Sequence, residues 1–257
     1  MSASSVSLRL EIAGPIATLS LARPDKHNAL SLAMLREITE VADAIDRSNV
    51  AVVVLRGDGP SFSSGFDLTD AARPSTDASV VADADLGRQA TEAISELDAV
   101  TIAQIHGYCI GGGFVLASAC DLRVVAEDAV FSIPEVDLGM PLTWGAIPRL
   151  VRELGPAVTR ELVLTGRRFT AAEALGWRFA NRVVPRGSLD AHTQSLAAEI
   201  AAKPRLVTTF TTRQVDAAVD ALCSADVGTT DARLLAAAVR ARRGDAGSQS
   251  APSSGTS

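Results

Sequence analysis

The hydrophobic pattern at the start of the chain predicts two strands followed by a helix. Apolar and polar residues alternate over 6–22, and Gly14-Pro15 marks a turn between two short strands. Apolar positions then recur at three- and four-residue steps over 32–47, which is the period of a helix with one buried face. Ser31 precedes this segment and belongs to a residue type that caps helix N-termini.

Continuous apolar runs in the next part of the chain predict strands that are covered on both faces. Strands and helices alternate here, which favours parallel strands joined by helical crossovers and therefore an α/β fold. The expected elements are strands over 51–56, 101–105, 122–126 and 129–131, a loop over most of 58–85, and helices over 86–98 and 114–119.

From Gly145 onward the pattern is helical. The Gly/Ser-rich composition of the last residues is typical of disorder. We therefore expect a core over 1–200, a helical segment over 201–243 and a disordered tail over 244–257. The predicted helices cover 146–153, 156–164, 171–176, 188–202, 205–221 and 230–242.

Composition and charge narrow the classes of protein to which the chain can belong. Its 257 residues include 24 Lys and Arg against 30 Asp and Glu, and the net charge of −6 argues against a nucleic-acid partner, because phosphate contacts need a clustered positive surface. The three His and three Cys show no metal-ligand spacing. Neither a bilayer-spanning apolar run nor a basic and apolar leader is visible, so we expect a cytoplasmic protein without metal or membrane contact.

A run of three glycines separates a predicted strand from a predicted helix. Gly111, Gly112 and Gly113 lack Cβ atoms, so backbone N–H groups are exposed at a helix N-terminus, which suits an oxyanion. The spacing is not that of a dinucleotide-binding loop. Close packing of the helix on the strand would explain the same residues.

A Pro- and Gly-rich segment further along carries one carboxylate and one large aromatic residue. Glu135 lies among apolar neighbours, where desolvation would raise its pKa toward the range of a proton shuttle. Trp144, one of two Trp residues, follows it. A surface loop glutamate and a core aromatic residue are the plain alternatives, and the small residues at 61–68 fit an ordinary turn.

Taken in order, these segments resemble the crotonase (enoyl-CoA hydratase/isomerase) superfamily over about residues 7–200. Residues 62–68 and the glycine run look like its two oxyanion segments, and 134–139 looks like its catalytic-glutamate motif. The stretch 23–30 looks like its first loop that contacts coenzyme A. The resemblance implies an α/β fold with a crotonase-like ββα spiral core and a helical C-terminal trimerisation segment, assembled as a homotrimer or homohexamer.

The resemblance also assigns roles to individual residues. In this family two backbone N–H groups hold the thioester carbonyl, and by motif they belong here to Phe66 and Gly112; Glu135 matches the catalytic glutamate. The implied substrate is an acyl-CoA thioester, whose coenzyme A is part of the substrate, and no further cofactor is implied. The expected substrate- and CoA-binding residues are Lys26, Asn28, Ala29, Leu30, Ser64, Gly65, Phe66, Asp67, Leu68, Gly111, Gly112, Val115, Pro134 and Trp144.

Coenzyme A carries negative phosphates, so basic contacts are expected in spite of the acidic net charge. Arg23 and Lys26 are the nearest candidates in the sequence. Thr69-Asp70 stands where many members have a lysine, so that contact is not expected here.

Two departures from the family pattern favour one reaction. Hydratases of the family use a second glutamate, and its position here is Val115; their Gly-rich stretch, which leaves room for water, here carries Trp144. Δ3,Δ2-Enoyl-CoA isomerases need only one carboxylate, so we interpret the chain as isomerase-like with Glu135 as the proton shuttle. An enoyl-CoA hydratase that works with Glu135 alone or with another carboxylate, and a non-catalytic acyl-CoA binding protein, remain the alternatives.

Overall fold

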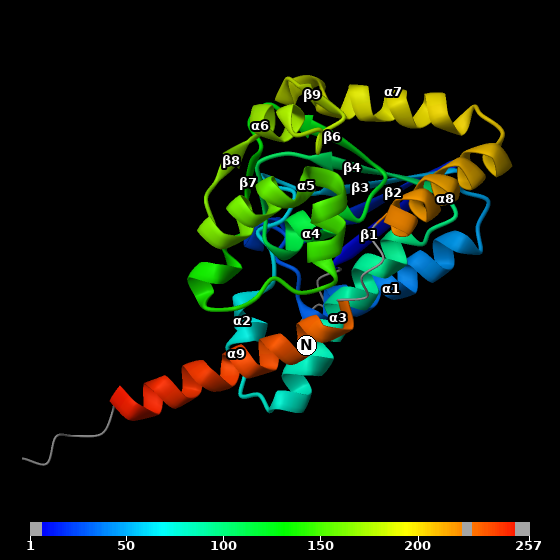
Figure 1. Ribbon diagram of the computed structural model, residues 1–257. Coiled ribbons are helices and arrows are strands. Elements are labelled where there is room, and N and C mark those ends of the chain that lie inside the picture. Colours follow the sequence, from blue (N-terminus) through cyan, green and yellow to red (C-terminus); the bar gives the residue numbers. More distant parts are fainter. Residues whose placement is uncertain (1–6, 223–227, 250–257) are drawn as a thin grey trace, which may run out of the picture.

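The computed structural model describes residues 7–222 and 228–249, and a six-stranded sheet lies at its centre (Figure 1). The strand order is β1-β2-β3-β4-β6-β9; the β1–β2 hairpin is antiparallel and every later pairing is parallel. The strands are β1 (Leu8–Ala13), β2 (Ile16–Leu21), β3 (Val52–Gly57), β4 (Val100–Ile105), β6 (Leu122–Ala126) and β9 (Arg182–Val184).

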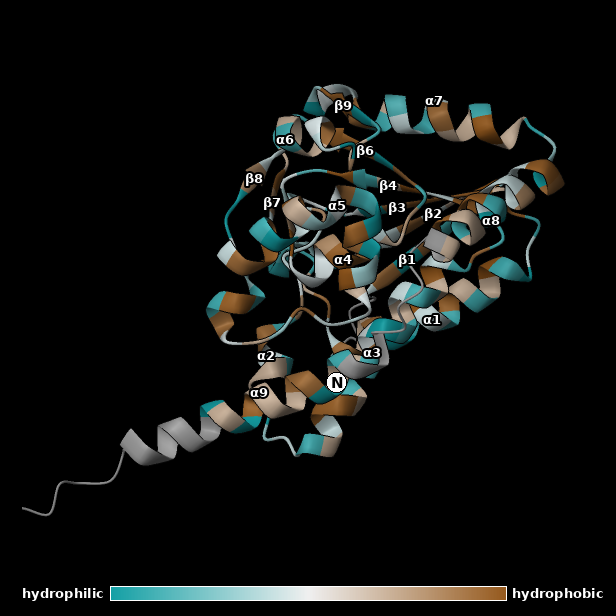
Figure 2. Cartoon of the chain, in the orientation of Figure 1, coloured by the Kyte–Doolittle hydropathy of each residue, from teal (hydrophilic) through white to brown (hydrophobic). Residues whose placement is uncertain are grey.

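Both faces of this sheet are buried, which explains the continuous apolar runs in the sequence. On β3, Val52 and Val54 belong to the apolar cluster beneath α7 (Leu189–Ala201), whereas Val53 and Leu55 belong to the larger cluster on the opposite face. Successive side chains of a strand point to opposite faces, so a strand covered twice has no polar alternation. Apolar residues accordingly follow the central strands in Figure 2.

A second sheet of three strands supports the short helix α4 (Gly112–Ser118). Phe114 of α4 stacks on Phe179 at a centroid distance of 4.5 Å and meets Phe131 and Phe169 edge-on. Four of the seven Phe residues of the chain thus pack together at this helix. Their packing fixes the start of α4. The strands are β5 (Tyr108–Ile110), β7 (Val130–Ser132) and β8 (Phe169–Thr170).

The remaining helices surround the two sheets (Figure 1). Gly155, with φ at 76°, interrupts α5, so the structure keeps the two helical pieces that the sequence predicts there. The helices that surround the sheets, besides α4 and α7, are η1 (Pro24–Lys26), α1 (Leu32–Asp46), α2 (Leu68–Ala71), α3 (Asp77–Ser95), η2 (Pro134–Leu138), α5 (Ala146–Thr165), α6 (Ala171–Gly176), η3 (Arg186–Ser188), α8 (Arg205–Leu222) and α9 (Gly228–Gln249).

Helix α3 begins well before the expected start at residue 86, so the predicted loop over 58–85 is wrong in its second half. The Thr76 side chain accepts a hydrogen bond from Ser79 N–H, and the Ser79 side chain accepts one from Thr76 N–H. This capping box starts a helix whose buried face consists mostly of small residues. Small side chains give a weak hydrophobic signal, so the periodicity alone underestimates the helix.

Two further elements differ from the prediction. Strand β9 was expected to be part of a helical region, but it pairs in parallel with β6. Three residues are too few to show a strand period, so only the neighbouring strand reveals it. Helix α9 runs to Gln249, past the expected end at residue 242 and into the segment 244–257 for which disorder is predicted. Residues 250–257 lie outside the described part of the chain, and the disordered tail stays a prediction.

Helix α9 lies along α3 (Figure 1), and Arg240 forms an ion pair with Asp77 at the start of α3. This contact joins two parts of the chain that are distant in sequence. None of the helices in the described residues is long and apolar enough to cross a membrane.

Candidate active site

The first oxyanion segment is held between two neighbouring chain segments. Leu30 N–H donates to Gly65 O at 2.8 Å, and Asp67 N–H donates to Leu30 O at 3.0 Å, so the loop pairs like a strand on both sides of Phe66. On the other edge, Ile110 N–H donates to Ser63 O at 3.0 Å. The Phe66 N–H, by contrast, has no acceptor among the described residues.

The second oxyanion segment brings another free N–H group to the same place. Gly112 is the first residue of α4, so its N–H has no acceptor within the helix. A Cβ atom placed on Gly112 would lie 3.5 Å from Phe66 N, and one on Gly65 would lie 3.4 Å from Gly112 N. The backbone N–H groups of Phe66 and Gly112 are therefore neighbours, and a substrate oxygen could accept hydrogen bonds from both.

Glu135 of η2 lies against Gly111, the residue directly before Gly112. A Cβ atom on Gly111 would lie 2.5 Å from Glu135 Oε1, so the glycine leaves the space that the carboxylate occupies. Glu135 Oε2 is buried and has no hydrogen-bond partner among the described residues. Burial raises the pKa of Glu135 to about 7, and no neighbouring charge contributes to the change. A carboxyl group with this pKa can accept and return a proton near neutral pH.

Two other carboxylates of the region are Asp67, which is ion-paired, and Asp137, which is exposed. Asp67 forms an ion pair with Arg23 at 2.9 Å; burial acts to raise the pKa of Asp67, but the hydrogen bond from Thr69 N–H and the Arg23 guanidinium lower it overall. Val115, where hydratases of the family carry their second glutamate, is only 1% exposed and lies in the apolar core.

Trp144 lies directly against the oxyanion segments. A Cβ atom on Gly112 would lie 2.6 Å from Cη2 and Cζ3 of the indole, and the Phe66 ring meets the indole edge-on at a centroid distance of 6.1 Å. The side chain is 7% exposed. The Trp144 indole therefore fills the space beside the paired N–H groups, and water cannot occupy the volume that the ring takes up.

The predicted first CoA loop is stabilised mainly by its own side chains. Asn28 is fully buried: its Oδ1 accepts from Arg23 N–H, and its Nδ2 donates to Asp58 O and Ser61 O, each at 2.8 Å. The Arg23 guanidinium donates to Ala29 O at 2.6 Å and pairs with Asp67 at 2.9 Å, which holds it against the loop. Its contact with a phosphate of coenzyme A stays a prediction.

The structure separates the other predicted binding residues into two groups. Leu30 is buried in the core, and Pro134 is half-buried at the start of η2. Lys26, Ser64 and Leu68 are exposed. Of these five residues, only Lys26, Ser64 and Leu68 present exposed side chains in the region where coenzyme A is expected to bind.

Three residues of the site were missed by the sequence analysis. A methyl group on Gly87 of α3 would overlap the Trp144 indole, and Gly145 N–H donates to Asp231 Oδ2 at 3.1 Å. The Thr91 hydroxyl donates to Arg88 O at 2.8 Å and makes a second, longer contact of 3.3 Å with Trp144 O. A glycine inside a helix costs about 1 kcal/mol relative to alanine, so Gly87 was a visible signal. Thr91 and Asp231 carried none. The described residues contain no group of His, Cys, Asp or Glu side chains able to hold a metal ion.

Most of the chain is similar in sequence to known proteins. Residues 11–250 match the sequence model of a family described as enoyl-CoA hydratase/isomerase. The chain is 38% identical over 201 residues to a carnitinyl-CoA dehydratase of Salmonella typhi, covering 76% of this chain and 75% of the relative.

Solved structures agree with this relationship. An enoyl-CoA hydratase/carnithine racemase of Magnetospirillum magneticum is 31% identical with a TM-score of 0.80, covering 88% of this chain and 85% of the other. A putative enoyl-CoA hydratase of Thermobifida fusca YX, solved in complex with acetoacetyl-CoA, is 30% identical with a TM-score of 0.79, covering 94% and 96%.

Proposed function

The chain belongs to the enoyl-CoA hydratase/isomerase family, and from that premise we propose that it moves a double bond in an acyl-CoA thioester, converting a 3-enoyl-CoA to a 2-enoyl-CoA. Coenzyme A enters as part of the substrate, so the reaction needs no separate cofactor. The single observation that carries the proposal is the position of Glu135: its desolvated carboxylate has no charged neighbour and lies against Gly111, next to Gly112, whose N–H and that of Phe66 are free.

Each step of the reaction has a group to perform it. The thioester oxygen accepts hydrogen bonds from Phe66 N–H and Gly112 N–H, which stabilise the negative charge that develops on it. The Glu135 carboxylate takes a proton from C2, giving a dienolate, and the resulting carboxylic acid returns that proton to C4. No atom is gained or lost, and one carboxyl group suffices for both transfers.

The surroundings of Glu135 favour proton return over addition of water. Hydration needs a second group that holds and activates water, and Val115 offers only methyl groups. The Trp144 indole occupies the space beside the N–H groups. Exclusion of water also protects a dienolate from solvent protons.

The direct test compares wild type with Glu135→Gln on 3-hexenoyl-CoA and on trans-2-hexenoyl-CoA. We expect isomerisation in the wild type and a loss of about a thousandfold or more in the variant, because the general base is gone. Acyl-CoA affinity should be retained, since the N–H groups are unchanged. Normal isomerisation by the variant would overturn the role of Glu135.

A second experiment tests the shuttle itself. In D2O, a proton that stays on a shielded Glu135 during transfer should appear at C4 as protium in a measurable fraction of product molecules, detected by mass spectrometry. Complete deuteration at C4 would show that Glu135 exchanges with solvent at every turnover and that the site is not shielded.

Hydration or dehydration is the second candidate function, because the relatives are described as dehydratase and hydratases. Glu135 would then act alone on a water molecule that enters beside Trp144. Rapid loss of the conjugated thioester absorbance of trans-2-hexenoyl-CoA, without isomerisation of the 3-enoyl substrate, would favour this candidate over the isomerase.

A further inference from the structure

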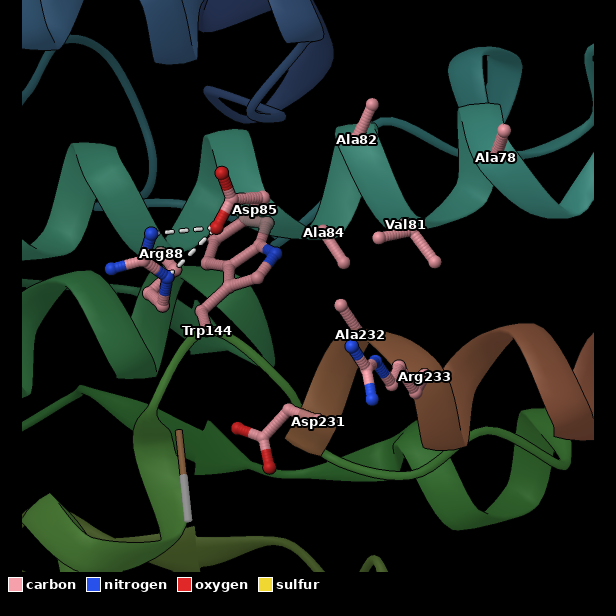
Figure 3. Close-up of a pocket in the computed structure, with 10 residues that line it drawn as sticks. All are labelled: Ala78, Val81, Ala82, Ala84, Asp85, Arg88, Trp144, Asp231, Ala232 and Arg233. Carbon is pink, nitrogen blue, oxygen red and sulfur yellow. Dashed lines mark hydrogen bonds and ion pairs between the residues drawn. The ribbon is translucent and has the colours of Figure 1, made fainter. Parts of the chain in front are cut away.

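A pocket of about 320 Å³ lies between α3 and the start of α9, and the mechanism above does not use it. Figure 3 shows Ala84 of α3 facing the same space as Ala232 and Arg233 of α9, with Trp144 at one side. Six of the ten lining residues are apolar, and the other four, Asp85, Arg88, Asp231 and Arg233, are charged. Asp85 and Arg88 pair with each other at 2.6 Å, so the small apolar side chains and the indole offer the surface that a hydrocarbon chain could contact.

The Trp144 indole stands between this pocket and the catalytic N–H groups. Its Cη2–Cζ3 edge contacts Gly112, whereas its Cδ1–Nε1–Cε2 edge lies over Gly87 of α3. Two pocket residues, Ala84 and Asp85, are neighbours of Gly87 on the same helix. The catalytic groups and the pocket are therefore on opposite edges of one aromatic side chain.

Contacts from two helices hold the indole in this position. The Trp144 backbone has a φ of 64°, a conformation that costs energy for a bulky residue and persists only where neighbours enforce it. Asp231 of α9, itself buried, accepts a hydrogen bond from Gly145 N–H. The buried Thr91 hydroxyl of α3 shares its hydrogen bond between Arg88 O at 2.8 Å and Trp144 O at 3.3 Å. The turn is thus fastened to both walls of the pocket.

We propose that Trp144 restricts the substrate to short acyl chains and that the pocket between α3 and α9 is an acyl compartment closed by the indole. Gly87 makes room for the indole, and Thr91 and Asp231 are positioning residues that act through the turn. The inference rests on the proposed function only in taking an acyl-CoA as the ligand; it is independent of which reaction follows.

The test measures the affinity of butyryl-CoA and decanoyl-CoA by calorimetry. Both thioesters are saturated, so they undergo neither isomerisation nor hydration, and failure of the isomerase proposal would leave these affinities unchanged. In the wild type we expect decanoyl-CoA to bind no more tightly than butyryl-CoA. In Trp144→Ala we expect it to bind at least about thirtyfold more tightly, because each buried methylene contributes about fourfold.

Filling the opened pocket provides the control. Adding Ala232→Leu to Trp144→Ala should return the ratio of the two affinities toward one. Trp144→Phe keeps an aromatic ring of smaller size and should give an intermediate ratio. Tight decanoyl-CoA binding by the wild type, or an unchanged ratio in a folded Trp144→Ala protein, would overturn the proposal. If neither thioester binds, the acyl-CoA ligand is wrong and both proposals fail.

Asp231 offers a test that leaves the indole intact, should Trp144→Ala fail to fold. Asp231→Ala removes the acceptor of Gly145 N–H and should loosen the turn, raising the relative affinity for decanoyl-CoA several-fold. Asp231→Asn keeps an oxygen at the same position and should retain the wild-type ratio. Equal ratios in these two variants would show that Asp231 does not position the indole.

Discussion

At the residue scale, the chemistry depends on the surroundings of Glu135. The carboxylate is withdrawn from water against Gly111 and receives no compensating cation, so its charged form is disfavoured. The same desolvation that makes Glu135 a useful base therefore makes it costly to keep ionised in the folded protein. Activity and stability should respond to its titration in opposite directions.

The pH dependence of activity follows from that pKa. Burial raises it from 4.5 to about 7, so kcat/KM should rise as pH increases through about 7, where the carboxyl group loses its proton. Initial rates with a 3-enoyl-CoA across this range provide the measurement. A flat profile from mildly acidic to alkaline pH would contradict the assignment.

The same titration predicts how stability changes with pH. The folded-state pKa lies above the unfolded value, so this group's contribution is fully present below 4.5 and is lost as pH rises through about 7. Glutamine does not ionise, so Glu135→Gln has no such loss of stability as pH rises. The variant should therefore gain stability relative to wild type by on the order of 1–3 kcal/mol between about pH 5 and about pH 8, measured by urea unfolding.

At the scale of elements, one buried side chain organises the predicted first CoA loop. Asn28 satisfies three backbone groups of this loop and the neighbouring one, and it does so with φ at 54°, a left-handed conformation that asparagine adopts more readily than most residues. The loop in turn pairs with the segment that presents Phe66 N–H. A structural residue thus sets the position of a catalytic donor.

We predict that Asn28→Ala lowers the free energy of unfolding by about 2–4 kcal/mol, because it leaves buried carbonyl groups unpaired and places alanine in a left-handed conformation. It should also lower kcat, since the Phe66 segment loses its support. Lys26→Ala is the matched control on the same loop: it is exposed, so its stability should change by less than about 0.5 kcal/mol. Equal destabilisation by both variants would refute the role of Asn28.

At the scale of the whole molecule, the crotonase-like fold predicted from the sequence is confirmed by the solved structures that match it. The packing of α9 on α3 brings Asp231 of α9 to the turn that carries Trp144. Helix α8 differs, because it leaves an apolar surface uncovered in the single chain. Its exposed apolar residues are Leu206, Val207, Phe210 and Val215.

Leu206, Val207 and Phe210 lie within about a third of the circumference of α8. An apolar patch of this kind is typical of a subunit interface, and the predicted homotrimer or homohexamer would cover it. Phe210, which is 56% exposed, should be central to that contact. Phe210→Asp is expected to shift the protein toward smaller species in light scattering. Ile12→Asp, at an exposed apolar position on β1, serves as the control. A monomeric wild type would contradict the prediction.

The sequence by itself determined the α/β class, the helix starting after Ser31, the buried central strands and the motif positions of Phe66, Gly112 and Glu135. These follow from local periodicity and from short motifs. It placed the start of α3 too late and missed β9, because small residues and very short strands carry little periodic signal. It gave no sign that Arg23, a predicted phosphate contact, pairs with Asp67.

Only the tertiary structure decided what surrounds the motif residues. The pKa of Glu135 depends on which atoms exclude water from it, and the position of Trp144 depends on Gly87, Thr91 and Asp231, which lie on two helices far from it in sequence. Desolvation and packing are properties of atoms brought together by folding. A linear pattern can therefore name the reacting groups, but the space and the water around them are set by long-range contacts.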